Sequence, residues 1–186
     1  VHADAWHADC VLGGSQKCLS CPPDMSFMSV SAAAWERVRE VGYAGYDALK
    51  PFDGAAEDVM RHPYTPNWWG MAALDAALEA LMSEGLEQVF ARHDAVARQC
   101  RAGLADIGLA LWPAPDAVNS PTVTAARIPD GWTWPEWRGA LSAEGLVVGG
   151  SLGPLNGTVF RLGHMGTQAD AERMERALAV MKRILG

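Results

Sequence analysis

The chain has 186 residues, 49% of them hydrophobic and 20% charged, and a formal net charge of −7. This composition is ordinary for a globular protein with one domain, or with one domain and a small extra lobe. The acidic balance argues against broad binding to nucleic acid, which needs a basic face, and no apolar run approaches the length that spans a bilayer.

The first predicted element is a short strand that ends in a lysine turn. An apolar run at residues 10–12 predicts a buried strand, and Gly13, Gly14 and Ser15 break it. Lys17 follows at once, in the position past a strand end where open sheets place their chemistry. An amine there becomes a nucleophile if its pKa is lowered, and its product is a Schiff base with a carbonyl substrate or with pyridoxal phosphate. A solvated, inert lysine is the alternative.

Two cysteines flank this turn. Cys18 and Cys21 form a Cys-x-x-Cys pair, but no second ligand pair follows at the spacing that a zinc site needs, so no metal site is predicted. A redox pair remains an alternative. We expect reduced thiols in a cytoplasmic protein.

The next elements are a strand, two helices and a long connection. Residues 24–30 alternate polar and apolar, which predicts a strand, and Ser31 is placed to cap a helix that begins at the next residue. Residues 43–66 are rich in Pro, Gly and Asp and predict an extended loop with a short helical turn. Asn67 caps a predicted amphipathic helix at 68–83, with an apolar stripe that includes Met71, Leu74, Leu78, Leu81 and Met82.

The second half of the chain predicts a compact α/β unit. Gly85 separates the preceding helix from another, in which the basic residues Arg92, His93, Arg98 and Arg101 indicate a solvated face. The elements that follow are strands at 109–112, 122–128, 146–148 and 158–162 and helices that begin near residues 134 and 170.

One arginine stands out in the last predicted strand. Arg161 lies between Phe160 and Leu162, and a buried arginine needs a carboxylate or phosphate partner. Its planar fork suits a substrate carboxylate, and an ion pair with an acidic residue of the core is the equal alternative. His164 is expected to be a core histidine with its hydrogen bonds satisfied.

Two motifs together resemble a known family. The run Gly-Gly-Ser-Gln-Lys-Cys-Leu at 13–19 resembles the cofactor-lysine segment of class V aminotransferases, in the alanine–glyoxylate and serine–glyoxylate branch. The segment 159–166 is similar to the family's substrate-carboxylate arginine motif. The resemblance implies an α/β fold, the C-terminal half of a fold-type-I pyridoxal-phosphate transferase. Residues 1–85 would then be the C-terminal part of the large cofactor-binding domain with its dimer-interface loop, and 86–186 the small C-terminal α/β domain.

The resemblance also implies roles for single residues. Lys17 would be the Schiff-base lysine and proton carrier, and Arg161 would bind the substrate carboxylate. Gln16, with Ser15 as a weaker candidate, would contact the cofactor phosphate. In a homodimer, Thr65 would contact the cofactor phosphate of the neighbouring subunit. The family often has a tyrosine at the position of His62, a role that Tyr64 is expected to take over.

The implied reaction is transamination between an amino acid of the alanine or serine type and a small 2-oxo acid such as glyoxylate or pyruvate. Leu152 stands near the place where the pyridoxamine–pyruvate branch tends to have a second arginine, which weakens that branch. The family's chains are longer, and its pyridine-binding aspartate and ring-stacking residue precede the lysine turn. We therefore expect an N-terminal half outside this chain, without which the chain is inactive. The alternatives are a non-catalytic fragment, or another fold-type-I enzyme such as a lyase.

Overall fold

The computed structural model of the protein describes residues 2–186, which form two compact units. The first unit comprises the residues up to Gln16 together with Cys21–Leu78, and the second comprises Lys17–Ser20 together with Glu79–Gly186. Among the described residues, no helix is long and apolar enough to cross a membrane.

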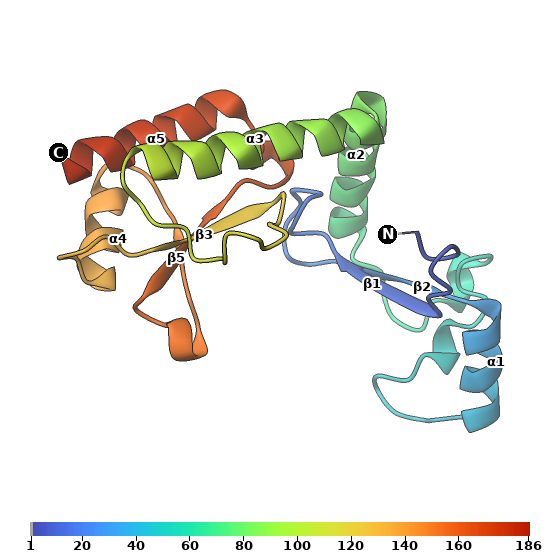
Figure 1. The fold of residues 1–186 in the computed structure, drawn as a ribbon. Coiled ribbons are helices and arrows are strands. Elements are labelled where there is room, and N and C mark those ends of the chain that lie inside the picture. Colours follow the sequence, from blue (N-terminus) through green and yellow to red (C-terminus); the bar gives the residue numbers. More distant parts are fainter. Residues whose placement is uncertain (1) are drawn as a thin grey trace. The chain divides into compact units, whose positions relative to one another are not determined.

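The first unit is built on a two-stranded hairpin. Strand β1 (Cys10–Gly14) pairs antiparallel with β2 (Ser26–Val30), with Cys10 opposite Val30 and Gly14 opposite Ser26 (Figure 1). Both predicted strands are confirmed, but Gly13 and Gly14, which were expected to break the first strand, are paired residues of β1. The expectation that β1 is buried is wrong, since Leu12 is 73% exposed. The reason is that side chains of a strand alternate between two faces, and the described chain covers only part of this small sheet.

Helices and short turns follow the hairpin. Ser31 caps α1 (Ala32–Val41) by accepting a hydrogen bond from the backbone of Ala34, as predicted. The long connection contains two 3₁₀ turns, η1 (Lys50–Phe52) and η2 (Val59–Arg61). Asn67 then caps α2 (Trp68–Glu84) through a 3.1 Å bond from Gly70 N to its Oδ1.

Helix α2 departs from the predicted amphipathic packing. Only Gly70 is buried, whereas Met71, Leu78 and Met82 are 42–64% exposed. Trp68 and Trp69 are also exposed and stack on each other with their ring centroids 3.8 Å apart. The predicted apolar stripe is therefore only partly covered by residues 2–186, which leave Leu74 and Leu81 half-buried and the other three side chains exposed.

The second unit contains a three-stranded antiparallel sheet. Its order is β3 (Val123–Arg127), β5 (Val159–Gly163) and β4 (Gly149–Gly150). The predicted strand at 146–148 is wrong, because Val147 is solvent-exposed and pairing begins only at Gly149. The predicted strand at 109–112 is reduced to a single bridge between Leu111 and Ala126.

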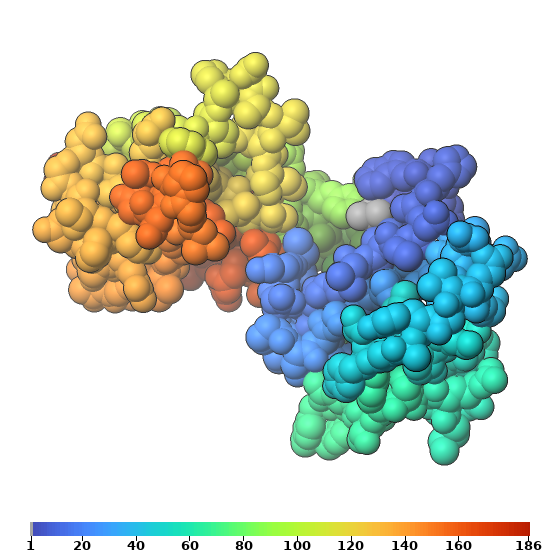
Figure 2. All heavy atoms as spheres, turned by 90° about the horizontal axis from the view of Figure 1, so that it is seen from below, coloured from blue at the N-terminus to red at the C-terminus, as the bar shows by residue number. Residues whose placement is uncertain are grey.

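Three helices enclose the core of this unit. Helices α3 (Leu86–Asp106) and α5 (Ala171–Leu185) lie side by side, and α4 (Trp134–Ala143) packs near α5 (Figure 1). The segment 114–120, yellow in Figure 2, has no helix or strand and stands out from the surface of the unit. The core is one apolar cluster that includes Val96, Cys100, Leu104, Ala126, Trp137, Leu141, Phe160, Leu162, Met174 and Met181.

Helix caps agree with the sequence in this unit. Asp170 caps α5 by accepting a 2.8 Å bond from Arg173 N. Thr133 and Glu136 form a capping box at the start of α4, and hydrogen bonds from Thr133 lower the pKa of the Glu136 carboxyl. Helices α4 and α5 thus begin at side-chain caps, whereas α3 begins after Gly85 without one.

Candidate functional site

The end of the hairpin forms a small cradle in the first unit. Gly13, Gly14 and Gln16 line a hollow of about 550 Å³, together with residues 23–26. A Cβ on Gly14 would lie 2.6 Å from Gln16 Oε1, so glycine leaves room for the exposed amide of Gln16. The hollow falls within the ~300–1,000 Å³ of ordinary ligand pockets, and the amide can donate to an anion.

Ser15 serves the turn itself. The residue is fully buried, its hydroxyl donates to Pro22 O at 2.6 Å, and the same oxygen accepts from Met25 N at 3.3 Å. The hydroxyl hydrogen is thus engaged inside the turn, and it would have to leave Pro22 before it could donate to a phosphate. The predicted phosphate contact of Ser15 stays a prediction.

Lys17 follows Gln16 along the chain and belongs to the second unit. Its side chain is exposed, and Ser20 N donates to Lys17 O at 2.9 Å to close a short turn. Ser20 has φ = 57°, in the left-handed region that non-glycine residues seldom adopt. The lysine is therefore carried on a constrained turn with its amine free to reach a ligand.

Arg161 lies on β5, in the middle of the sheet. It stands opposite Ala125 on one side and Gly149 on the other, and its Nε donates to Gly150 O at 2.8 Å. The expectation of a buried arginine is wrong, because Arg161 is exposed while its neighbours Phe160 and Leu162 are buried on the opposite face. Within residues 2–186 it forms no ion pair, which removes the alternative of a core salt bridge.

His164 follows the same strand and is a core residue, as predicted. It is fully buried, with Nε2 2.9 Å from Thr124 Oγ1 and Nδ1 3.2 Å from Pro121 O. Because a carbonyl can only accept, Nδ1 donates to Pro121. Burial lowers the pKa of the His164 imidazole below its ordinary value.

The loop with Tyr64 and Thr65 belongs to the first unit. The Tyr64 hydroxyl donates to Tyr46 O at 2.7 Å, and its ring lies near Tyr46 and Phe52. Thr65 lines a second hollow of about 500 Å³, with His62 among its other lining residues. Whether either residue reaches a cofactor phosphate is not decided within one chain, and both roles stay predictions.

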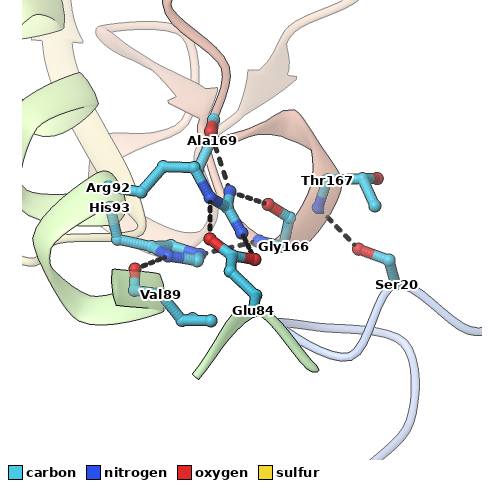
Figure 3. Close-up of polar contacts among 8 residues, drawn as sticks. All are labelled: Ser20, Glu84, Val89, Arg92, His93, Gly166, Thr167 and Ala169. Carbon is cyan, nitrogen blue, oxygen red and sulfur yellow. Dashed lines mark hydrogen bonds and ion pairs between the residues drawn. The ribbon is translucent and has the colours of Figure 1, made fainter. Parts of the chain in front are cut away.

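A polar group on α3 is the part of the site that sequence analysis misread. Arg92 donates to both carboxylate oxygens of Glu84 at 2.6 and 2.8 Å, and to the carbonyls of Gly166 and Ala169 at 2.9 and 2.8 Å (Figure 3). His93 is only 5% exposed. The expected solvated face is therefore wrong for these two residues. The available signal was spacing, since His93 falls four and three residues from the buried Val89 and Val96.

The ion pair has the expected effect on the acid. The Arg92 guanidinium, through its hydrogen bonds to Glu84, lowers the pKa of that carboxyl, although burial acts in the opposite direction. Both side chains remain about one-third exposed, so solvent screens the attraction. The ion pair therefore adds little stability, and the bonds from Arg92 to two backbone carbonyls serve mainly to fix the position of the segment 166–169.

Comparison with known proteins gives a consistent result. No family model matches the chain. An aminotransferase of Methanocaldococcus jannaschii is 37% identical over 177 residues, which cover 92% of this chain and 45% of the relative. The pyridoxamine–pyruvate transaminase of Mesorhizobium japonicum is 36% identical over 173 residues, or 91% of this chain and 44% of the relative.

A solved structure extends the likeness to three dimensions. The alanine–glyoxylate aminotransferase of Nostoc sp. matches with a TM-score of 0.92 and 28% identity, over all of this chain and 50% of that one. The chain therefore spans about half the length of the proteins that it matches. The predicted α/β fold is confirmed, and the mixed sheet-and-helix units above correspond to half of such a protein.

Proposed function

We propose that this chain, a homologue of the fold-type-I aminotransferases, supplies the cofactor lysine and the carboxylate-binding arginine of a pyridoxal-phosphate-dependent transaminase. The observation that carries the proposal is the exposed Lys17 on a constrained turn directly after β1, within the motif at 13–19. The two relatives described above are named as an aminotransferase and a transaminase, and their matches cover 92% and 91% of this chain.

The residues at the strand end fit the cofactor chemically. Gly13 and Gly14 line the hollow at the strand end, the amide of Gln16 can donate to a phosphate oxygen, and Lys17 supplies a primary amine. When bound, pyridoxal phosphate supplies an electron sink for the charge that develops at the α-carbon of an amino acid. Lys17 Nζ would hold the cofactor covalently through its amine and, as a free amine, would carry the proton that leaves the α-carbon of the substrate.

Arg161 is proposed to orient the substrate. Its guanidinium lies beside two glycines, because Nε is bonded to Gly150 O and a Cβ on Gly149 would lie only 3.6 Å from Nη2. The strand and this one hydrogen bond fix the plane of the fork, while no acid of the described chain neutralises it. A planar fork held in this way can bind a carboxylate by two parallel hydrogen bonds.

The activity of the whole protein is part of the proposal. Relatives named for alanine and glyoxylate, and for pyridoxamine and pyruvate, support a small amino donor and a small 2-oxo acid acceptor. We place the protein in the cytoplasm as a homodimer, in which Thr65 and Tyr64 face a neighbouring cofactor phosphate. The uncovered tryptophans of α2 support a partner surface of some kind, since large exposed apolar side chains mark contact sites.

The test uses the full-length protein that contains this chain. Glycine formation from glyoxylate, with L-alanine or L-serine as donor and pyridoxal phosphate added, should be detectable for the wild type. Lys17→Arg keeps the charge but removes the nucleophilic amine, so the rate should fall by about 100- to 10,000-fold. Lys182→Arg, an exposed lysine on α5, is the matched control and should behave as the wild type. Equal rates for both variants would refute the role of Lys17.

A further inference from the structure

The segment that follows Lys17 rests directly on a second turn. Ser20 Oγ accepts a 2.9 Å hydrogen bond from Thr167 N, the second residue of the 3₁₀ turn η4 (Gly166–Gln168) (Figure 3). Gly166 has φ = 58°, and a Cβ there would lie 2.0 Å from Ser20 Oγ and 2.9 Å from Cys18 O. The two turns are therefore in contact at a point where only glycine fits.

The turn η4 is in turn fixed to helix α3. Gly166 N donates to His93 Nε2 at 2.9 Å, and His93 Nδ1 lies 2.7 Å from Val89 O. The Gly166 N–H can only donate, so His93 Nε2 accepts and carries no hydrogen. The Val89 carbonyl can only accept, so the hydrogen of the ring is on Nδ1. Arg92 bonds the carbonyls at both ends of the turn, Gly166 O and Ala169 O.

We propose that η4 is a platform that positions the catalytic lysine, with Ser20 as the positioning residue on the lysine turn and His93 as the one that holds the platform. The route is continuous: Lys17 O accepts from Ser20 N, Ser20 Oγ accepts from Thr167 N, and the neighbouring Gly166 N is held by His93. This inference rests on the proposed function, because the position of Lys17 matters for catalysis only if its amine binds the cofactor.

The platform also joins the two halves of the proposed chemistry. It begins three residues after β5 (Val159–Gly163), the strand that carries Arg161. The position of η4 is thus set by β5, which carries Arg161, and η4 in turn fixes the position of the lysine turn through Ser20. Catalytic groups need this kind of mutual fixation, since a misplacement of about 1 Å can cost about 100-fold in rate.

The backbone of Ser20 is held by its surroundings in an unfavourable conformation. Its φ of 57° is unfavourable for serine, and such residues persist only where their surroundings determine the conformation. Its bond to Thr167 is exposed to solvent, so it contributes little to overall stability. Loss of the hydroxyl should therefore affect the placement of Lys17 more than the folding of the chain.

The test compares Ser20→Gly with Ser20→Ala in the full-length protein. Both lose the hydroxyl, but glycine accepts φ = 57° whereas alanine does not. We expect the urea midpoint of Ser20→Gly to equal or exceed that of the wild type, and that of Ser20→Ala to fall. In both variants kcat for glycine formation should drop about 10-fold, KM should change less than about 2-fold, and the Kd for pyridoxal phosphate should rise about 5-fold.

A readout without cofactor separates this inference from the proposed function. Amide hydrogen exchange in the peptide 164–170 of the cofactor-free protein should be faster in both Ser20 variants than in the wild type. Lys182→Arg, an exposed residue of α5 outside the turn and outside the measured peptide, is the control and should leave all measurements unchanged. If Ser20→Gly keeps wild-type kcat, Kd and exchange, the platform is overturned while the proposed function stands. A wild type that neither binds pyridoxal phosphate nor forms glycine would overturn the proposed function, and the positioning of a catalytic lysine with it.

Discussion

Replacing His93 by leucine, and separately by glutamine, measures how firmly α3 holds the turn η4. His93 is almost fully buried, and Nε2 accepts the Gly166 N–H at 2.9 Å. Leucine fills much of the space but offers no acceptor. Glutamine places an amide oxygen close to the position of Nε2 and can accept the same bond.

The expected magnitude follows from the buried donor. An N–H left without a partner away from water costs about 1–3 kcal/mol, and partial movement of the turn toward solvent lowers this figure. We therefore expect the leucine variant to lose about 1–2 kcal/mol at this bond, which is a factor of about 5–30 in a local equilibrium. Glutamine should lose much less, because it restores the acceptor but not the bond to Val89 O.

The assay is amide hydrogen exchange at Gly166 in the full-length protein, because exchange of this amide reports the opening of the bond itself. The rate should be about 5- to 30-fold higher in His93→Leu than in the wild type, with His93→Gln close to the wild type. The amide of Leu104, at the buried end of α3, serves as an internal reference that should not change. Equal exchange at Gly166 in all three proteins would show that His93 does not hold the turn.

Three further predictions concern single side chains. Burial lowers the pKa of His164 in the folded chain, so as the pH falls the unfolded chain binds a proton first. The free energy of unfolding should therefore be maintained above about pH 6.5 and decline below it. Urea midpoints at pH 8 and pH 5 should differ less in His164→Asn than in the wild type. Arg161→Ala should weaken transition-state binding, measured through kcat/KM, by about 1.5–3 kcal/mol, and Arg161→Lys by less; near-wild-type kcat/KM in both variants would place the substrate carboxylate elsewhere. Gly166→Ala should destabilise the chain by about 1–3 kcal/mol, and adding Ser20→Gly should recover part of the loss; strict additivity in a double-mutant cycle would argue against their contact.

The lysine turn was accessible from sequence because its signals are local. Gly13 and Gly14 follow a short apolar run and the prolines at 22 and 23 close the segment, so a turn between them needs no tertiary information, although the strand itself continues through both glycines. Ser31 and Asn67 were likewise predicted as helix caps, since a capping side chain bonds its own first turn. These local rules place Lys17 on a turn after β1 but leave its surroundings open.

The misread residues depend on what covers each face. Arg161 was expected to be buried because its neighbours are apolar, yet the alternation of a strand places Phe160 and Leu162 on one face and Arg161 on the other. Leu12 and the stripe residues Met71, Leu78 and Met82 of α2 are exposed because residues 2–186 do not cover them. No local pattern shows which of two apolar faces will be covered.

The platform beneath the lysine turn could not be predicted in full. Helical spacing could have assigned His93 to the buried stripe of α3, but its bond to Gly166 joins residues 73 positions apart. The contact of Ser20 with Thr167 spans 147 positions. Sequence gave the parts of the site, and only the fold shows that the two turns meet.

The central claim is that Lys17 is the amine that binds the cofactor, and covalent labelling tests it most directly. The full-length protein is loaded with pyridoxal phosphate, reduced with borohydride, digested and mapped by mass spectrometry. Reduction makes the carbon–nitrogen bond permanent, so the account predicts the added mass on the peptide that contains Lys17 and on no other. A label on Lys50 or Lys182 instead, or no label on a folded, cofactor-loaded protein, would contradict it.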